Sequence, residues 1–307
     1  MLVFFLWEGM DMTRQWGKLA AAGALWFGAS ASAAFAGSVT QPGETVGLAV
    51  GAPLPEGLYF VNTGDWGCRS TKPNTTCVGV DIPVVAWATP LRVLNASFNL
   101  LVAAPLVEVG VQHTDYFFGV YNPLFAGQFA WDLGNGFSFS YLLGAYFDVH
   151  SDAAWSSTSI NQRFGLSYTG NDWNITANVI WGTHLDPVTD RPQLSPCPGT
   201  LPRGCNPDFI NVDLTVVKKF GKFQFGPVAF GSTDLNSPIP AYRKQSQIAV
   251  GALIGYDFGP LTLQGYVTTD VYEKNYGGHD TRVWGRIILP VWTPPAPPAA
   301  PPLITKG

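Results

Sequence analysis

The stretch FINVDLTVV, residues 209–217, decides the fold class because apolar and polar side chains alternate along most of its length. One set of positions is apolar and the other is polar; the two sets are Ile210, Val212, Leu214 and Val216 against Asn211, Asp213 and Thr215. Successive side chains of an extended strand point to opposite faces. The stretch therefore predicts a β-strand with one apolar and one polar face.

The same alternation recurs along the chain, for example in WNITANVIW at 173–181 and GFSFSYL at 136–142. Alternation alone does not say which face is buried, because a soluble β-sandwich turns its apolar face inward and a membrane barrel turns it toward lipid. We predict twelve strands, at residues 56–66, 80–90, 96–110, 124–134, 136–148, 159–170, 171–184, 208–220, 222–234, 244–258, 260–273 and 280–292.

The lengths of the connections favour the membrane barrel. Tight connections alternate with longer ones; the tight ones are 133–136, 169–172, 220–222 and 258–260, and the longer ones are 67–79, 111–123, 149–158, 185–207, 235–243 and 274–279. Outer-membrane barrels have an even number of strands, short periplasmic turns and longer extracellular loops. A soluble sandwich has no reason to place its long loops at one end. We expect an all-β fold, a single transmembrane antiparallel barrel of about twelve strands over residues 56–292.

The composition agrees with a surface that meets lipid. Charged residues make up 12% of the chain, against about 25% in a typical soluble domain, and aromatic residues make up 14%. After the N-terminal segment there is no run of about 20 apolar residues, so transmembrane helices are not expected. The net charge of −4 and the lack of a Lys/Arg run argue against a nucleic-acid partner.

The N-terminus has the three parts of a bacterial signal peptide, which we expect to span residues 1–36. Arg14 and Lys18 supply the basic region, an apolar region follows, and Ala34-Phe35-Ala36 fits a small-residue cleavage site. We expect translation to start at Met10 or Met12, because the residues before them carry acidic side chains. A short buried helix is the alternative interpretation.

Export leads to the outer membrane of a Gram-negative bacterium, where we expect lipid and the barrel-assembly machinery as partners. Residues 37–55 would then form an N-terminal periplasmic segment, and residues 293–307 a periplasmic tail rich in proline and alanine.

The four cysteines form two local pairs, Cys68 with Cys77 and Cys197 with Cys205. Each pair flanks a polar stretch in a predicted extracellular loop, and loops closed by disulfides are typical of an oxidising compartment. A zinc site is the alternative, but neither pair has C-x-x-C spacing and no histidine lies nearby. We expect two disulfides and no metal.

No catalytic motif stands out, since G-x-S-x-G, H-E-x-x-H, P-loop and EF-hand spacings are all missing from the sequence. An outer-membrane phospholipase is the enzymatic alternative, and it would need serine and histidine two residues apart on the outer face of a strand. Ser151 lies between His150 and Asp152 but falls in a predicted loop. We expect neither an enzyme nor a bound cofactor.

The polar members of the alternations are the candidates for a lumen that sets selectivity. The candidates are Asn161, Arg163, Asn174, Thr176, Asn178, Asn211, Asp213, Thr215, Gln264, Asp270, Arg282 and Arg286. Alternatively, they fill the barrel with a polar network. The aromatic stretch TDYFFGVYNP at 114–123 is a candidate constriction loop that folds inward, with candidate residues Tyr116, Phe117, Phe118 and Tyr121.

Several hairpins resemble those of a known family. The segments are GAPLPEGLYFVN at 51–62, NPLFAGQFAWDLGNGFSFSYLLGAYF at 122–147 and VGALIGYDFGPLTLQGYVTTDVY at 250–272. Over roughly residues 50–292 the chain resembles the outer-membrane proteins of the MetA-pathway of phenol degradation family, the SphA-like transporters. It departs from them at Phe147-Asp148-Val149, where the family has Pro-Thr-Gly, and in its cysteine pairs.

This resemblance implies a channel for passive uptake of small hydrophobic or aromatic compounds. A structural or surface-interaction barrel without transport is the alternative. The two differ in the lumen, since a cleft that can hold a ligand favours transport and a lumen sealed by a saturated polar network favours a structural role.

Overall fold

The computed structural model describes residues 38–71, 74–113, 115–149, 157–185, 206–238, 240 and 242–295. Within these ranges no helix has the length and apolar character needed to span a bilayer. The expected signal peptide, the Cys197/Cys205 pair and the tail from residue 296 lie outside the described residues.

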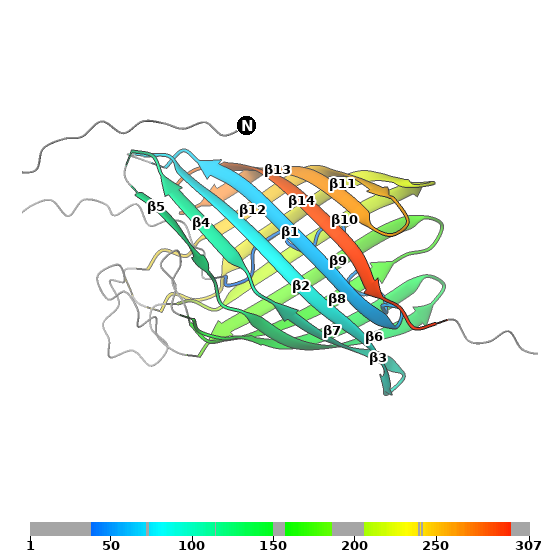
Figure 1. Ribbon diagram of the computed structural model, residues 1–307. Helices are drawn as coiled ribbons and strands as arrows, with labels where there is room; N and C mark the ends of the chain where they lie inside the picture. Colours follow the sequence, from blue (N-terminus) through cyan, green and yellow to red (C-terminus); the bar gives the residue numbers. More distant parts are fainter. Residues whose placement is uncertain are drawn as a thin grey trace, which may run out of the picture. The chain divides into compact units, whose positions relative to one another are not determined.

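The described part of the chain is built from strands that form one antiparallel sheet (Figure 1). The strands are β1 (Gly57–Arg69), β2 (Thr76–Val93), β3 (Ala96–Ala103), β4 (Leu106–Val111), β5 (Asp115–Val120), β6 (Leu124–Gly134), β7 (Phe137–Tyr146), β8 (Ser159–Tyr168), β9 (Trp173–His184), β10 (Phe209–Phe220), β11 (Phe223–Asp234), β12 (Ser246–Asp257), β13 (Thr262–Lys274) and β14 (Asp280–Trp292).

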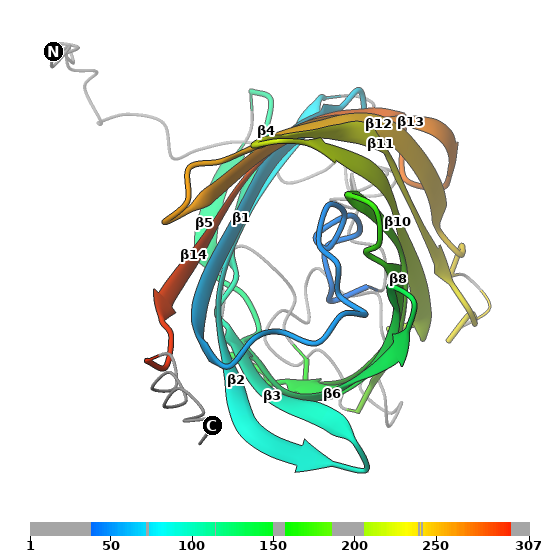
Figure 2. The same cartoon turned by 90° about the vertical axis from the view of Figure 1, so that its right-hand side faces the viewer.

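The sheet closes into a barrel because β1 pairs with β14 on one side and with β2 on the other (Figure 2). β3 and β4 both pair with β2, and they act as one strand interrupted at Ala104 and Pro105. β5 and β6 likewise share one position in the wall, interrupted at 121–123. The closed circuit therefore has twelve strands, which confirms the prediction.

Both interruptions contain a proline, Pro105 in the first and Pro123 in the second. Proline has no N–H to donate to a ladder, which favours an interruption of the pairing at these two positions. The predicted loop at 111–123 is wrong, because β4 supplies a pairing partner for each residue of β5 (Asp115–Val120), which extends the wall beyond Pro123.

Short and long connections lie at opposite ends, as predicted. At one end, here called the short-turn end, two residues join β2 to β3, β6 to β7 and β10 to β11. At the other, the long-loop end, residues 185–208 join β9 to β10. Asn135 and Gly136 of one tight turn have φ values of 53° and 82°, the left-handed region that two-residue hairpin loops require.

The two faces of the wall are inverted relative to a soluble protein. On β10, Asn211, Asp213 and Thr215 are buried inside, whereas Leu214 is 43% exposed on the outside. Phe225 and Ile254 also lie on the outside, and each is more than half exposed. An apolar exterior over a polar interior is the pattern of a membrane barrel and excludes the soluble sandwich.

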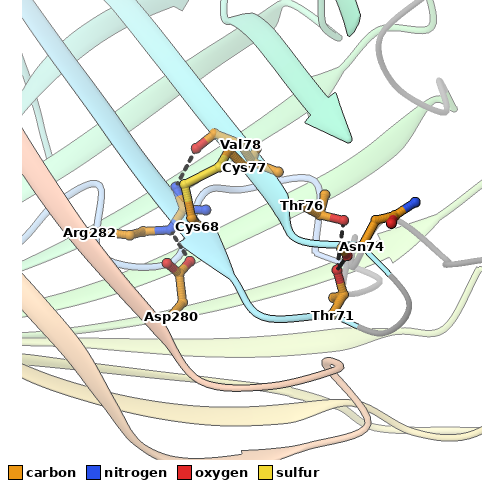
Figure 3. The surroundings of a disulfide bond; sticks show 8 residues. All are labelled: Cys68, Thr71, Asn74, Thr76, Cys77, Val78, Asp280 and Arg282. Carbon is orange, nitrogen blue, oxygen red and sulfur yellow. Dashed lines mark hydrogen bonds and ion pairs between the residues drawn. A yellow bond between two sulfur atoms is a disulfide. The ribbon is translucent and has the colours of Figure 1, made fainter. Parts of the chain in front are cut away.

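Cys68 and Cys77 form the predicted disulfide, with their sulfurs 2.07 Å apart (Figure 3). They are direct partners across β1 and β2. The expectation that both lie in a loop is wrong, because these strands continue past the predicted ends at residues 66 and 80.

Candidate functional site: the lumen and the segment that fills it

The N-terminal segment of the described chain, residues 38–53, lies inside the barrel (Figure 2). Ser38 contacts Asn211 near the long-loop end, and Gly51 contacts Ser167 near the short-turn end. The segment therefore runs the length of the lumen before β1 begins. Within the described part, the expectation of a separate periplasmic segment at 37–55 is wrong, because polar lumen side chains bind this stretch inside the barrel.

Asp213 on β10 holds one turn of the segment. Its carboxylate accepts hydrogen bonds from the Gly43 N–H at 2.9 Å, the Thr45 N–H at 3.0 Å and the Thr45 hydroxyl at 2.6 Å. Two positions further along the strand, Thr215 Oγ1 accepts from the Gly47 N–H at 2.7 Å. The polar face of β10 predicted from the sequence is thus the attachment face for the segment.

Arg286 on β14 is fully buried and holds the segment from another part of the wall. Its guanidinium donates to the backbone oxygens of Val46 and Glu44 and to Gln264 Oε1. It also lies 5.5 Å from the ring centroid of Tyr266. These contacts spread the buried charge over several acceptors, which a lone buried cation requires.

Glu44 is paired within the lumen. Its Oε1 is 2.7 Å from Nη1 of Arg163 on β8, and Arg163 also donates to Asn161 at 2.8 Å and to the Tyr146 hydroxyl at 3.0 Å. Glu44 and Arg163 are both nearly buried, so each offsets the desolvation of the other.

Gly47 is required by the close approach of segment and wall. Its φ is +86°, and a Cβ there would lie 2.5 Å from the Leu253 side chain and 3.2 Å from that of Arg286. A side chain at this position would therefore both strain the backbone and push the segment off the wall.

The remaining predicted lumen residues also face inward. Asn174 and Gln264 both donate to the Gly47 oxygen of the segment, and Asn178 donates to the Thr45 hydroxyl. Thr176 hydrogen-bonds to Asn174 and Ser167, and these two residues in turn contact the segment. Sequence reasoning missed three further residues that hydrogen-bond to the segment, Ser140, Gln128 and Ser167. Each occupies a polar position in a stretch that alternates between apolar and polar residues.

Asp270 and Arg282 belong to a second group on the long-loop side. In this group Arg282 and Asp280 lie beside the disulfide (Figure 3). Arg69 is 3.0 Å from Asp270 and 3.6 Å from Asp280. Arg282 donates to Asp280 at 2.7 Å and to Asp65. Sequence reasoning missed Arg69 because it was assigned to a loop; its position after a predicted strand gave no signal of inward direction.

Tyr276, in the connection between β13 and β14, packs under the guanidinium of Arg69 at 4.6 Å from its ring centroid. Burial raises the pKa of the Tyr276 phenol above its usual value, so the group stays neutral.

A cavity of about 90 Å³ remains between the N-terminal segment and the wall on the long-loop side. The apolar residues that line it are Val78, Val80, Ile82, Pro105, Val107 and Tyr121. The polar and charged residues that line it include Gln41, Glu44, Arg69, Gln247 and Arg282. The lumen is thus filled in its short-turn half but keeps an amphipathic space near the long loops.

The four constriction candidates divide between the two faces of β5 and its continuation. Tyr116 and Phe118 point outward and are 67% and 57% exposed. Phe117 and Tyr121 pack against the buried apolar cluster of the lumen. The expected inward-folded loop is therefore wrong, because this stretch is a strand and a strand sends successive side chains to opposite faces.

No catalytic or metal centre emerges from the described ranges. Ser157 Oγ and His184 Nδ1 are 2.6 Å apart, but both are buried and neither lines the cavity. No group of three or more His, Cys, Asp or Glu side chains in these ranges is placed to hold a metal ion.

Comparison with solved structures supports the fold. The outer-membrane channel of group COG4313 from Pseudomonas putida F1 has a TM-score of 0.62 at 9% identity, covering 78% of this chain and 97% of that one. The TodX monoaromatic hydrocarbon channel, in a mutant form, has a TM-score of 0.44 at 9% identity over 78% and 92% of the two chains. At 9% identity the likeness to the COG4313 channel concerns the fold alone, and the similarity to TodX is too low to support an argument.

No curated protein matches the sequence. The sequence profile of the MetA-pathway of phenol degradation family matches residues 54–287, which include every strand of the barrel except the last residues of β14. The chain belongs to the MetA-pathway of phenol degradation family.

Proposed function

We propose that the protein is an outer-membrane channel for passive uptake of small hydrophobic or aromatic compounds. The observation that carries the proposal is the cavity of about 90 Å³ with an apolar side, held inside a closed barrel. Binding sites for small molecules are concave, largely apolar and carry a few placed polar groups. Membership in the family supports the same class of solute.

The route is confined to small solutes. Between the cavity and the short-turn end, the N-terminal segment occupies the lumen. Near the cavity the wall is weaker, because among the described strands β5 pairs only with β4. Tyr121 and Pro105, which line the cavity, lie at the two interruptions of the wall. A lateral exit beside β5 would let an apolar solute pass into the membrane without displacing the whole segment.

The polar lumen residues set the selectivity in this proposal. Asp213, Arg163 and Arg286 hold the segment in place and thereby limit the width that a solute can use. Cleavage near Gly37 and insertion by the barrel-assembly machinery belong to the same proposal, which for these steps rests on the signal-peptide pattern of the N-terminal sequence.

A structural or surface-interaction barrel is the second candidate. It is favoured by the density of hydrogen bonds between the segment and the wall, which is the arrangement expected of a sealed lumen. In that case the long loops would carry the function.

The test is uptake of a labelled monoaromatic hydrocarbon by cells with an intact lipopolysaccharide layer, which slows such solutes, with and without the protein. The channel predicts faster uptake on expression, and small or no ion conductance in planar bilayers because the lumen is filled. The Val80→Phe variant, which fills the cavity, should remove the gain. Unchanged uptake with correctly folded protein in the membrane would instead support the structural role.

A further inference from the structure

The outside of the barrel carries a patch of positive charge at the long-loop end. Among the described residues, exposed Lys and Arg side chains occur only at the two ends of the barrel. At the long-loop end they are Arg243 and Lys244, just before β12, and Lys274, the last residue of β13. We propose that these three residues, here called the basic patch, bind the phosphate groups of an acylated glycolipid in the outer leaflet of the membrane. The inference concerns the outer wall and does not depend on transport.

Hydrogen bonds hold the two parts of the basic patch together. Lys274 is the direct partner of Ser246 across β13 and β12. The next residue, Asn275, donates from its side chain to the Lys244 oxygen at 2.7 Å, and its own oxygen accepts from the Gln245 side chain at 3.2 Å. The connection before β12 and the end of β13 are therefore fixed to each other, which keeps the three positive charges close together.

The basic patch is not neutralised by the protein. Within the described ranges, none of its three cations forms an ion pair with a carboxylate. Lys244 donates to the Leu235 oxygen at 3.3 Å, and an ammonium group has two further protons to donate. The donors of the patch are thus available to an anion.

The two acidic residues next to the basic patch are engaged elsewhere. The Asp234 carboxylate is buried and accepts from the Tyr242 hydroxyl at 2.7 Å and from the Gln245 N–H at 2.8 Å. Glu273 accepts from the Tyr276 N–H at 3.0 Å. Like charges held close together repel each other, so an anion from outside the chain would stabilise the patch.

The wall between the basic patch and the short-turn end is apolar. Ile248 and Val250 of β12 are exposed on the outer face, as are Val267 and Tyr272 of β13. Tyr272 is the direct partner of Ile248, and tyrosine is typical of the level where lipid meets water. A ligand that covers the patch and this panel must be anionic at one end and apolar at the other, as a membrane lipid is.

The position of the basic patch selects the lipid. Long loops of outer-membrane barrels are extracellular, so the patch lies at the level of the outer leaflet. The anionic lipids of that leaflet are phosphorylated saccharides that carry acyl chains. A phosphate group offers several strong acceptor oxygens to Lys and Arg side chains, and the acyl chains would lie along the apolar panel.

A second copy of the chain fits the basic patch less well. A symmetric contact would bring two such patches face to face, and like charges repel. An asymmetric contact would need an acidic outer face, which Asp81 of β2 and Glu108 of β4 could supply, since their sequence neighbours face the lumen. These carboxylates already accept from Asn62 at 2.8 Å and from Tyr116 at 3.0 Å, which makes them weaker partners than a lipid phosphate.

The experiment is native mass spectrometry of the folded mature protein in detergent, titrated with lipid A, an acylated disaccharide with two phosphates. We expect one lipid A to bind per chain. The variant Arg243→Gln/Lys244→Gln/Lys274→Gln should bind lipid A about 100-fold more weakly, because each cation near an anionic headgroup contributes roughly a factor of five. Unchanged binding to this variant would refute the proposal.

The matched control is Arg92→Gln/Lys219→Gln/Lys222→Gln. It removes one exposed arginine and two exposed lysines from the short-turn end, so it changes the net charge by the same amount. Lipid A should bind to this variant as it binds to the native protein. An equal loss of binding in both variants would mean that net charge, and not the basic patch, holds the lipid.

Two further probes identify the ligand chemistry. Lipid A without its phosphates should bind at least tenfold more weakly than lipid A, and so should inorganic phosphate. If the dephosphorylated lipid binds equally well, the phosphates are not recognised and the proposal fails. If inorganic phosphate binds equally well, the site takes a free anion and the assignment to a lipid fails.

The same spectra report self-association. Dimers of the native protein that disappear in the basic-patch variant, with lipid A binding unchanged, would assign the patch to a contact between copies and contradict the proposal. Heat-modifiable gel mobility shows whether each variant is folded. If the triple variant does not fold, Lys274→Gln alone replaces it, with an expected loss of roughly fivefold in lipid A binding.

Discussion

Leu214 and Asp213 are neighbours on β10 but lie in opposite surroundings. Leu214 is 43% exposed on the outer face, and Asp213 is buried against the N-terminal segment. We predict that Leu214→Arg destabilises the folded barrel by about 2–4 kcal/mol, the cost of a cation on the lipid face near the midplane. Denaturant titration in phospholipid vesicles measures this cost. A neutral result would place Leu214 away from lipid.

Asp213→Ala removes the carboxylate that accepts three hydrogen bonds from the segment. Hydrogen bonds to charged groups contribute about 1.5–3 kcal/mol each at most, so the barrel should fold while the segment leaves the lumen more often. Planar-bilayer recordings should then show brief openings that the native protein lacks. The control is Glu56→Ala, which removes an exposed carboxylate outside the lumen and should show none.

The β2–β3 hairpin shows strain at the scale of one element. Leu94 and Asn95 form its two-residue turn with φ values of 50° and 63°, and Leu94 is 86% exposed. Leucine in the left-handed region costs about 1–2 kcal/mol, whereas asparagine tolerates it. We predict that Leu94→Asn stabilises the barrel by about 0.5–1 kcal/mol, measured by the same denaturant titration.

Leu133, at the next turn, provides the matched control. It is 59% exposed but does not have a positive φ. Leu133→Asn should therefore give no gain. An equal gain at both positions would mean that reduced surface hydrophobicity, and not backbone strain, is the cause.

β5 shows where reasoning from single elements fails. Its six residues are followed by Pro123, and a short apolar run next to a proline predicts a loop. The run becomes a strand because β4, which itself pairs with β2, supplies a partner at each of its positions. Longer strands such as β10 could be predicted because their alternation continues over several residues, here from Ile210 to Val216.

At the scale of the whole molecule, the closed barrel followed from the alternation and the connection lengths, both of which are local in sequence. The polar face of each strand could be predicted in the same way, and Asn178 and Arg286 do face inward. The content of the lumen could not be predicted. The segment at 38–53 has no period of its own, and its partners lie far along the chain, for example Glu44 with Arg286 and Gly47 with Thr215.

The central claim is that this segment lies inside the barrel, and a pair of cysteines tests it most directly. The Asn178 amide donates to the Thr45 hydroxyl at 3.1 Å, so Thr45→Cys with Asn178→Cys should form a disulfide in intact outer membranes. Thr45→Cys with Leu214→Cys, whose second cysteine faces outward, should not. Non-reducing peptide mapping detects the disulfide in each double variant, and heat-modifiable gel mobility shows that the protein mapped is folded. The structure predicts a disulfide in the Thr45→Cys/Asn178→Cys variant alone; folded protein of this variant that lacks the disulfide would contradict it.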